Sequence, residues 1–231
     1  MTNTVSKEAG YAEGRLLARP EHASRAGKPG SYRLGLDQER DALLYVPTSY
    51  SPARPAPFVV TLHGAGGSAD NGLRPLLPLA DRFGMILLSP YARLSTWDVI
   101  HDAYGPDVAH IDHALDEAFA CFAVDADHVA IEGFSDGASY ALSLGIANGD
   151  LFTHIMAFSP GFMAPTTQVG APRIFVSHGT HDPTLRIDRT SRTIVPRLKQ
   201  AGYDVVYEEF DGGHTVPPFI AHAAAAWFTS T

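Results

Sequence analysis

The chain has 231 residues, of which 45% are apolar and 18% charged. This length fits one domain with a sizeable core, and the composition is too apolar for a disordered chain. Lys and Arg total 17 against 25 Asp and Glu, a formal net charge of −8. That balance argues against a nucleic-acid partner, because such surfaces carry an excess of basic residues. The single cysteine, Cys121, excludes an internal disulfide framework and any thiolate metal cluster.

The beginning of the chain lacks the features of a targeting sequence. Residues 1–14 are polar, and the nearest apolar run is only Leu16–Ala18. A secretory signal needs a basic start and an apolar stretch of about 7–15 residues. No window approaches the ~18 consecutive apolar residues of a membrane span. We therefore expect a soluble protein without a signal peptide or membrane partner, cytoplasmic if it is bacterial.

Two parts of unequal size are expected. Residues 1–30 are rich in Gly, Ala, Ser and charged residues, which predicts a flexible or loosely packed N-terminal arm with one strand at Gly14–Arg19. Residues 31–231 are expected to form a single domain. Within it, the short strand-like runs Ser31–Leu36 and Ala42–Val46 predict a hairpin.

From residue 57 onward, continuous apolar runs alternate with helix-length stretches. Runs without polar alternation are typical of strands buried on both faces of a parallel sheet. The expected strands are Phe58–Leu62, Met85–Leu88, Val129–Ile131, Ile155–Phe158, Ile174–Val176 and Tyr203–Phe210. The expected helices are about Leu73–Phe83, Val108–Phe122, Ser135–Asn148, Ser191–Ala201 and Pro217–Phe228. This order predicts an α/β fold, a mostly parallel central sheet with helices on both faces.

A G-x-S-x-G pattern follows the third of these apolar runs. Gly133–Gly137 lies between an expected strand and an expected helix, which is the setting in which this pattern presents a nucleophilic serine. The glycines avoid collisions in a very tight turn, and the helix N-terminus favours developing negative charge at Ser135. An N-capping serine in a glycine-rich turn is the alternative.

Backbone donors for an oxyanion are expected in two loops. Acyl transfer uses one N–H from the residue after the nucleophile and one from an early strand–helix loop. The sequence offers Asp136 and, within His63–Gly67, Ala65 as the corresponding residues. That glycine-rich loop is not followed by Lys-Ser or Lys-Thr, which excludes a phosphate-binding P-loop.

Two further loops after strands carry an acid and a base. Asp182 follows the run Ile174–Ser177, and His214 follows Tyr203–Phe210. The order Ser, Asp, His is that of hydrolase triads on α/β sheets. In such a triad His214 takes the proton of the serine and Asp182 orients the imidazole. Asp188 is the reserve candidate for the acid, and His181, which precedes the acid, does not fit the order for the base.

The motifs together resemble the serine α/β-hydrolase superfamily. Within it, the chain is similar to the phospholipase/carboxylesterase group, near the dienelactone-hydrolase-like and polyhydroxybutyrate-depolymerase-like esterases. The resemblance covers about residues 42–228. It depends on His63–Gly67, Gly133–Gly137, Gly179–Asp182 and Gly213–His214, with Ser159–Gly161 as a more family-specific stretch. Cys121 lies in an expected helix and not at the elbow, unlike the nucleophilic cysteine of dienelactone hydrolases proper.

The resemblance implies ester hydrolysis through an acyl-enzyme, with neither a cofactor nor a metal. The expected function is a serine carboxylesterase acting on short-chain or accessible, even polymeric, esters. A thioesterase, a lysophospholipase-type acyl hydrolase or a small peptidase on the same triad is the alternative. A binding protein that keeps the fold without catalysis is a third hypothesis. The sequence does not indicate the natural ester or the oligomeric state.

Several residues near the expected strand ends are candidates for the substrate pocket. Trp97 could wall the pocket or pack a loop onto the core, and Leu185 and Val216 lie close in sequence to triad members. Asp136, directly after the nucleophile, could disfavour anionic substrates or point away from the pocket. The connections between strands are too short for a substantial helical lid, although residues 164–170 could form a small flap. An open cleft favours short acyl chains.

One helix carries His110 and His113 together with Asp107 and Asp112. Residues three apart share one side of a helix, which raises the possibility of a metal face. Metal-binding helix pairs usually place two histidines four apart beside a glutamate. A solvated amphipathic helix is therefore the preferred interpretation. Glu132, just before the elbow, receives no role from the sequence.

Overall fold

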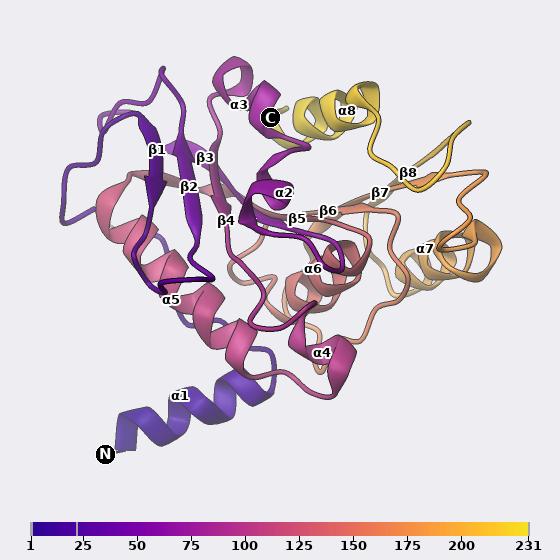
Figure 1. Ribbon diagram of the computed structural model, residues 1–231, viewed down its shortest axis with the longest axis horizontal. Helices are drawn as coiled ribbons and strands as arrows, with labels where there is room; N and C mark the ends of the chain where they lie inside the picture. Colours follow the sequence, from indigo (N-terminus) through magenta and orange to yellow (C-terminus); the bar gives the residue numbers. More distant parts are fainter. Residues whose placement is uncertain (1, 22, 231) are drawn as a thin grey trace.

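The computed structural model describes residues 2–21 and 23–230. Eight strands form one sheet: β1 (Gly30–Arg33), β2 (Leu43–Val46), β3 (Ala56–Leu62), β4 (Ile86–Ser89), β5 (Val124–Phe134), β6 (His154–Phe158), β7 (Arg173–Gly179) and β8 (Val205–Phe210). The helices are α1 (Thr2–Ala12), α2 (Ala69–Leu73), α3 (Leu77–Phe83), α4 (Asp98–His101), α5 (Pro106–Cys121), α6 (Asp136–Ala147), α7 (Ser191–Gln200) and α8 (Pro218–Thr229), with a 3₁₀ turn η1 at Ile187–Arg189 (Figure 1).

The strand order is β1-β2-β4-β3-β5-β6-β7-β8. β1 and β2 pair antiparallel, as the predicted hairpin requires, and β2 pairs antiparallel with β4. All pairs from β4 to β8 are parallel. The carboxyl ends of β3, β5, β7 and β8 therefore lie at one edge of the sheet, which is where an open α/β sheet binds its ligands.

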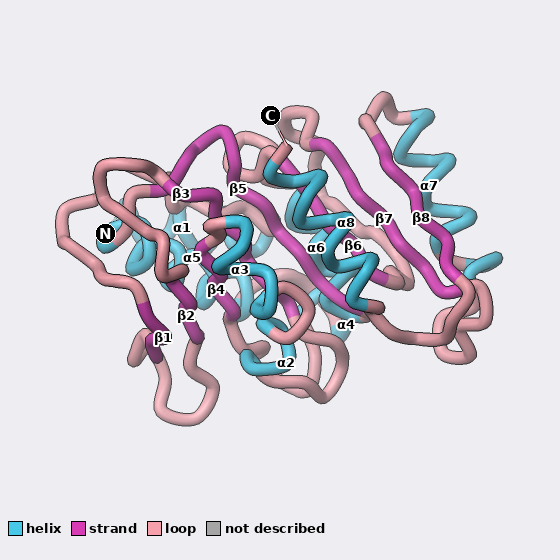
Figure 2. Tube along the Cα trace, turned by 90° about the horizontal axis from the view of Figure 1, so that it is seen from above, coloured by secondary structure: helices cyan, strands magenta, loops and turns pink. Residues whose placement is uncertain are grey.

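Helices cover both faces of the sheet, because the central strands are apolar on both sides. Successive residues of β3 alternate between the two cores: Phe58, Val60 and Leu62 face one, and Val59 faces the other. The first core is closed by α5, α6 and α7, and the second by α2, α3 and α8. Figure 2 shows α3 and α8 in front of the strands and α6 behind them. The predicted mostly parallel α/β architecture is confirmed.

The segment before β1 packs more closely than a loose arm. Leu16 is fully buried, and its N–H donates to Asn148 Oδ1 over 2.8 Å. The N–H groups of Leu17 and Ala18 both donate to Asp112 Oδ1 on α5. The strand expected at residues 14–19 is absent from this segment, because these backbone groups bond to side chains and not to a neighbouring strand.

The helix expected at about Leu73–Phe83 is interrupted near its beginning. Residues 73–83 contain Pro75 and Pro78; α2 ends at Leu73 and α3 begins at Leu77. Proline lacks an N–H and disfavours helical backbone in the residue before it, but it is well suited to the first turn of a helix. The intervening turn places residues 74 and 75 at the site described below. Within the described ranges, no helix combines the length and the hydropathy needed to cross a membrane.

Glu132 is buried in the middle of the sheet, three residues before Ser135. It pairs in register with Thr61 of β3 and Met156 of β6, and neither carboxyl oxygen has a hydrogen-bond partner among the described residues. Burial raises the pKa of Glu132 well above its ordinary value. Burial without a partner therefore favours the neutral acid over the carboxylate in the folded protein.

The buried acid makes stability depend on pH. Above the ordinary pKa of glutamate the unfolded chain loses a proton that the folded chain keeps, so the free energy of unfolding falls as pH rises, by up to about 1.4 kcal/mol per unit. Glu132→Gln is expected to remove this contribution, and its stability relative to the wild type should rise from pH 5 to pH 8 in urea titrations. Glu208→Gln, exposed on β8, is the control. A constant difference across this range would contradict a neutral Glu132.

Candidate active site

The turn between β5 and α6 holds Ser135 in a strained backbone conformation. Its φ is 59°, a left-handed value that non-glycine residues rarely adopt. The glycines on either side are required by close contacts: a Cβ on Gly133 would lie 2.2 Å from the carbonyl carbon of Gly137, and one on Gly137 would lie 2.3 Å from Leu62 O. The Ser135 N–H donates to Phe158 O over 2.9 Å. The nucleophile elbow expected from the sequence is thus present as a geometry.

Three side chains from three loops meet at this edge of the sheet. His214 Nε2 lies 2.8 Å from Ser135 Oγ, and His214 Nδ1 lies 2.6 Å from Asp182 Oδ2. Ser135 follows β5, Asp182 follows β7 and His214 follows β8. With the proton on Nδ1, the imidazole donates to the carboxylate and its Nε2 accepts from the serine hydroxyl. The structure thus brings together the serine, acid and base that the sequence predicts.

Asp182 is surrounded by donors. Its Oδ1 accepts the N–H groups of Thr184 and Leu185, each over 2.8 Å. His178 Nε2 lies 3.2 Å from its Oδ2. Burial alone would raise the pKa of Asp182, but the Leu185 amide, His214 and the Thr184 amide outweigh it and lower the pKa below its ordinary value. The lowered pKa favours the ionised form of this carboxyl group.

Sequence reasoning gave His178 no role. Its imidazole is fully buried, with Nε2 2.7 Å from Leu185 O and Nδ1 2.7 Å from Ser191 Oγ. Burial lowers its pKa, which keeps the ring neutral, with Nε2–H donating and Nδ1 accepting. The sequence feature that could have identified His178 is its place as a polar residue at the end of the apolar run of β7. His178 thus ties the loop of Asp182 to the start of α7.

The loop after β3 presents an unused backbone donor. Gly67 N–H donates to Gly64 O over 3.0 Å, closing a turn whose third residue, Gly66, has a φ of 65°. The N–H groups of Ala65 and Asp136 have no acceptor among the described residues. Gly64 lies against Ser135, because a Cβ there would be 3.3 Å from Ser135 Cβ. Both donors expected for the oxyanion are therefore free.

Trp97 holds this loop and does not line the pocket. It is fully buried, its ring stacks on Tyr140 at 5.1 Å, and its Nε1–H donates to His63 O over 2.9 Å. His63 Nε2 in turn accepts the Ala92 N–H over 3.1 Å, and burial lowers the pKa of His63, which keeps that nitrogen free to accept. The expected pocket wall is corrected to a support beneath the loop after β3, residues 63–67.

Asp136 is directed at a neighbouring loop. Its Oδ2 accepts the Thr96 hydroxyl over 2.7 Å. It is not among the residues that line the pocket. The sequence left open whether this carboxylate meets the substrate or points away, and the structure shows it bonded to Thr96.

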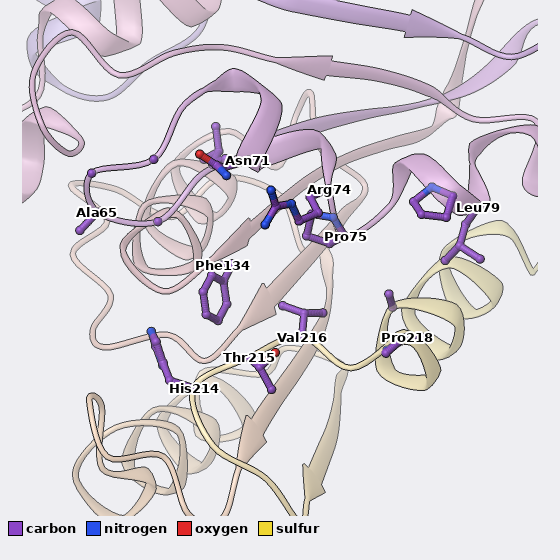
Figure 3. A pocket seen from close by; sticks show the side chains of 16 residues that line it. Ala65, Asn71, Arg74, Pro75, Leu79, Phe134, His214, Thr215, Val216 and Pro218 are labelled. Carbon is purple, nitrogen blue, oxygen red and sulfur yellow. The ribbon is translucent and has the colours of Figure 1, made fainter.

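A pocket of about 630 Å³ opens beside His214. One wall comes from the loop after β3 and the turn between α2 and α3, and the other from the residues after β8 (Figure 3). Most of its lining is apolar, including Leu79, Phe134 and Val216, and the Phe134 ring lies 4.7 Å from the His214 ring. An apolar pocket of this size with few polar groups is typical of a small-molecule site.

Of the other expected pocket residues, Val216 lines the pocket and Leu185 does not. Leu185 is half-buried and packs towards Gly161, where a Cβ would lie 3.4 Å from it. The possible flap is held down, because Ala164 accepts from Tyr104 Oη and donates to Ser143 Oγ. It contributes no residue to the pocket lining.

Two acidic residues of α5, Asp107 and Asp112, have structural roles. Asp107 is buried and accepts the N–H groups of Arg93 and Asp98, and the buried Asp112 accepts those of residues 17 and 18. The preferred solvated interpretation is therefore wrong for these two residues. Asp188, the reserve acid, pairs at 2.6 Å with Arg192 on α7 and is largely exposed.

The profile of the phospholipase/carboxylesterase family matches residues 98–221. The chain belongs to this family. Among curated proteins, it is similar to feruloyl esterase C of Emericella nidulans, with 26% identity over 182 residues, which are 73% of this chain and 66% of that protein. The chain spans about two thirds or less of the length of the curated relatives it matches.

Solved structures share the fold at low sequence identity. Esterase PE8 matches with a TM-score of 0.64 and 22% identity, covering 80% of this chain and 95% of that one. A CE1 ferulic acid esterase of Anaeromyces mucronatus, solved with ferulic acid, matches with a TM-score of 0.64 and 15% identity, covering 92% and 94%. These likenesses establish the α/β-hydrolase fold.

Proposed function

We propose that the protein is a serine carboxylesterase. The observation that carries this proposal is the continuous chain of hydrogen bonds from Ser135 through His214 to Asp182, 2.8 and 2.6 Å long. Membership of the phospholipase/carboxylesterase family supports it, as does the similarity to a feruloyl esterase. An esterase of aromatic or other accessible carboxylic esters is consistent with both.

The residues act in two half-reactions. Ser135 Oγ attacks the ester carbonyl while His214 Nε2 takes its proton, and His214 then gives that proton to the leaving alcohol. Water, deprotonated by His214, attacks the acyl-enzyme and releases the acid. The N–H groups of Ala65 and Asp136 stabilise the oxyanion in both steps, a contribution of about 3 kcal/mol per donor in comparable sites. Asp182 keeps the imidazole in the required tautomer.

A thioesterase on the same residues is the second candidate. The mostly apolar lining of the pocket can accommodate the chain of a thioester as well as that of an oxygen ester. A peptidase is less favoured, since an amine is a poorer leaving group than an alcohol or a thiol.

The test is a panel of 4-nitrophenyl esters with acyl chains of increasing length, together with matched thioesters. We expect the highest kcat/KM at short chains, because no described segment forms a helical lid over the pocket. A fluorophosphonate probe should label the protein at Ser135, detected by mass spectrometry of the labelled peptide. Labelling elsewhere, or no turnover of any acyl substrate, would contradict the proposal. A maximum at long chains would contradict the open cleft alone.

A further inference from the structure

Among the described residues that line the pocket, Arg74 is the only Lys, Arg, Asp or Glu. It lies in the turn between α2 and α3, beyond the end of α2 at Leu73. In Figure 3, Arg74 and Asn71 extend from one side of the pocket, and His214, Thr215 and Val216 from the other. The chain as a whole is acidic, with a formal net charge of −8.

The guanidinium of Arg74 has no ion-pair partner in the part of the chain that the structure describes. The carboxylate nearest in sequence to the nucleophile, Asp136, is bonded to Thr96 and lies outside the pocket lining. The five N–H donors of Arg74 are thus available to a ligand. Arg74 is exposed to solvent at the pocket, and hydrogen bonds from its guanidinium to an anion are stronger than those between neutral groups.

Asn71 adds an oriented donor beside Arg74. Its Oδ1 accepts both the N–H and the hydroxyl of Ser68, at 3.0 and 3.1 Å. These bonds fix the amide group, so that its NH₂ is the end left to donate. The pocket therefore combines a guanidinium and an amide NH₂ on one wall with no opposing carboxylate.

We propose that Arg74, assisted by Asn71, recognises a carboxylate on the substrate, so that the preferred esters are anionic. This inference depends on the proposed esterase function and names its substrate class. The carboxylate can belong to the acyl part, as in the monoester of a dicarboxylic acid, or to the alcohol part. Arginine suits the role because its planar fork binds both oxygens of a carboxylate.

The experiment uses two pairs of esters that differ only in charge. In the acyl pair, 4-nitrophenyl hydrogen adipate is compared with 4-nitrophenyl 6-oxoheptanoate, which has a methyl group in place of a carboxylate oxygen. In the alcohol pair, 3-acetoxybenzoate is compared with 3-acetoxyacetophenone. We expect the wild type to favour the anionic member of at least one pair by about tenfold in kcat/KM, which corresponds to about 1.4 kcal/mol.

Variants assign the preference to Arg74. In Arg74→Met the ratio of kcat/KM between the anionic and the neutral ester should fall towards one, mainly through KM, whereas Arg74→Lys should keep part of it because the charge remains. Arg82→Met is the matched control: it removes one positive charge from an exposed residue of α3 outside the pocket lining, and the ratio should stay as in the wild type.

The outcomes separate this inference from the proposed function. Turnover of the neutral esters without any anionic preference, or a preference that survives Arg74→Met, overturns the role of Arg74 and leaves the esterase intact. A preference lost equally in Arg82→Met assigns it to net charge and also overturns the role of Arg74. If none of the four esters is hydrolysed, the proposed esterase function itself is overturned.

Discussion

Ser135→Ala is expected to lower kcat for ester hydrolysis by about 10⁴-fold or more, because the nucleophile is lost while the backbone donors and the pocket remain. The residual rate would come from the oxyanion donors and substrate positioning. The fold should survive, since alanine meets the same backbone constraint at a φ of 59° that serine already tolerates. Kinetics with a short-chain 4-nitrophenyl ester and a urea titration of the same sample measure both effects.

The matched control is Ser31→Ala, an exposed serine on β1 far along the sheet from the site. It should keep wild-type turnover and fluorophosphonate labelling, and Ser135→Ala should lose both. Undiminished turnover in a folded Ser135→Ala protein would refute the assignment of the nucleophile, and with it the mechanism.

Asp182→Asn is expected to lower kcat by about 10⁴-fold. An amide in place of the carboxylate can donate to His214 Nδ1, which favours the tautomer with the proton on Nε2. That tautomer cannot accept the proton of Ser135. Because the asparagine oxygen can still accept the amides of Thr184 and Leu185, the loop should keep its shape, and circular dichroism should match the wild type.

Asp188→Asn distinguishes the two acids considered from the sequence. Asp188 is exposed and bonded to Arg192, so its loss should change kcat by less than about threefold, since an exposed ion pair contributes little. The hypothesis of Asp182 as the orienting acid fails if Asp188→Asn is the more damaging substitution.

The sequence was sufficient for the parts of the fold that local chemistry determines. Phe58–Leu62 and Ile155–Phe158 lack polar alternation because both faces of these strands are covered, and each forms a strand. The glycines at 133 and 137 are required by backbone contacts, so their spacing, together with their place between an expected strand and an expected helix, predicted the elbow. The order of Ser135, Asp182 and His214 predicted which side chains lie within hydrogen-bonding distance.

Other features depend on contacts that no local pattern records. Trp97 could have walled the pocket or supported a loop, and the choice depends on Tyr140 and His63, which lie 43 and 34 residues away along the chain. Leu16 looked like part of a loose arm because its partner, Asn148, is distant in sequence. Arg74 was not singled out, since an arginine in a proline-rich turn is ordinary until the fold places it in a pocket.

His214 follows β8, the strand at one edge of the sheet, which pairs with β7 alone among the described strands. Ser135 follows β5, which pairs with a strand on each side. Outer strands open at a lower cost in free energy than central ones, in local events that leave the rest of the sheet paired. Local opening of β8 would therefore separate the imidazole from the serine without cooperative unfolding of the sheet. The proposed catalytic arrangement is therefore no more stable than the pairing of β8 with β7.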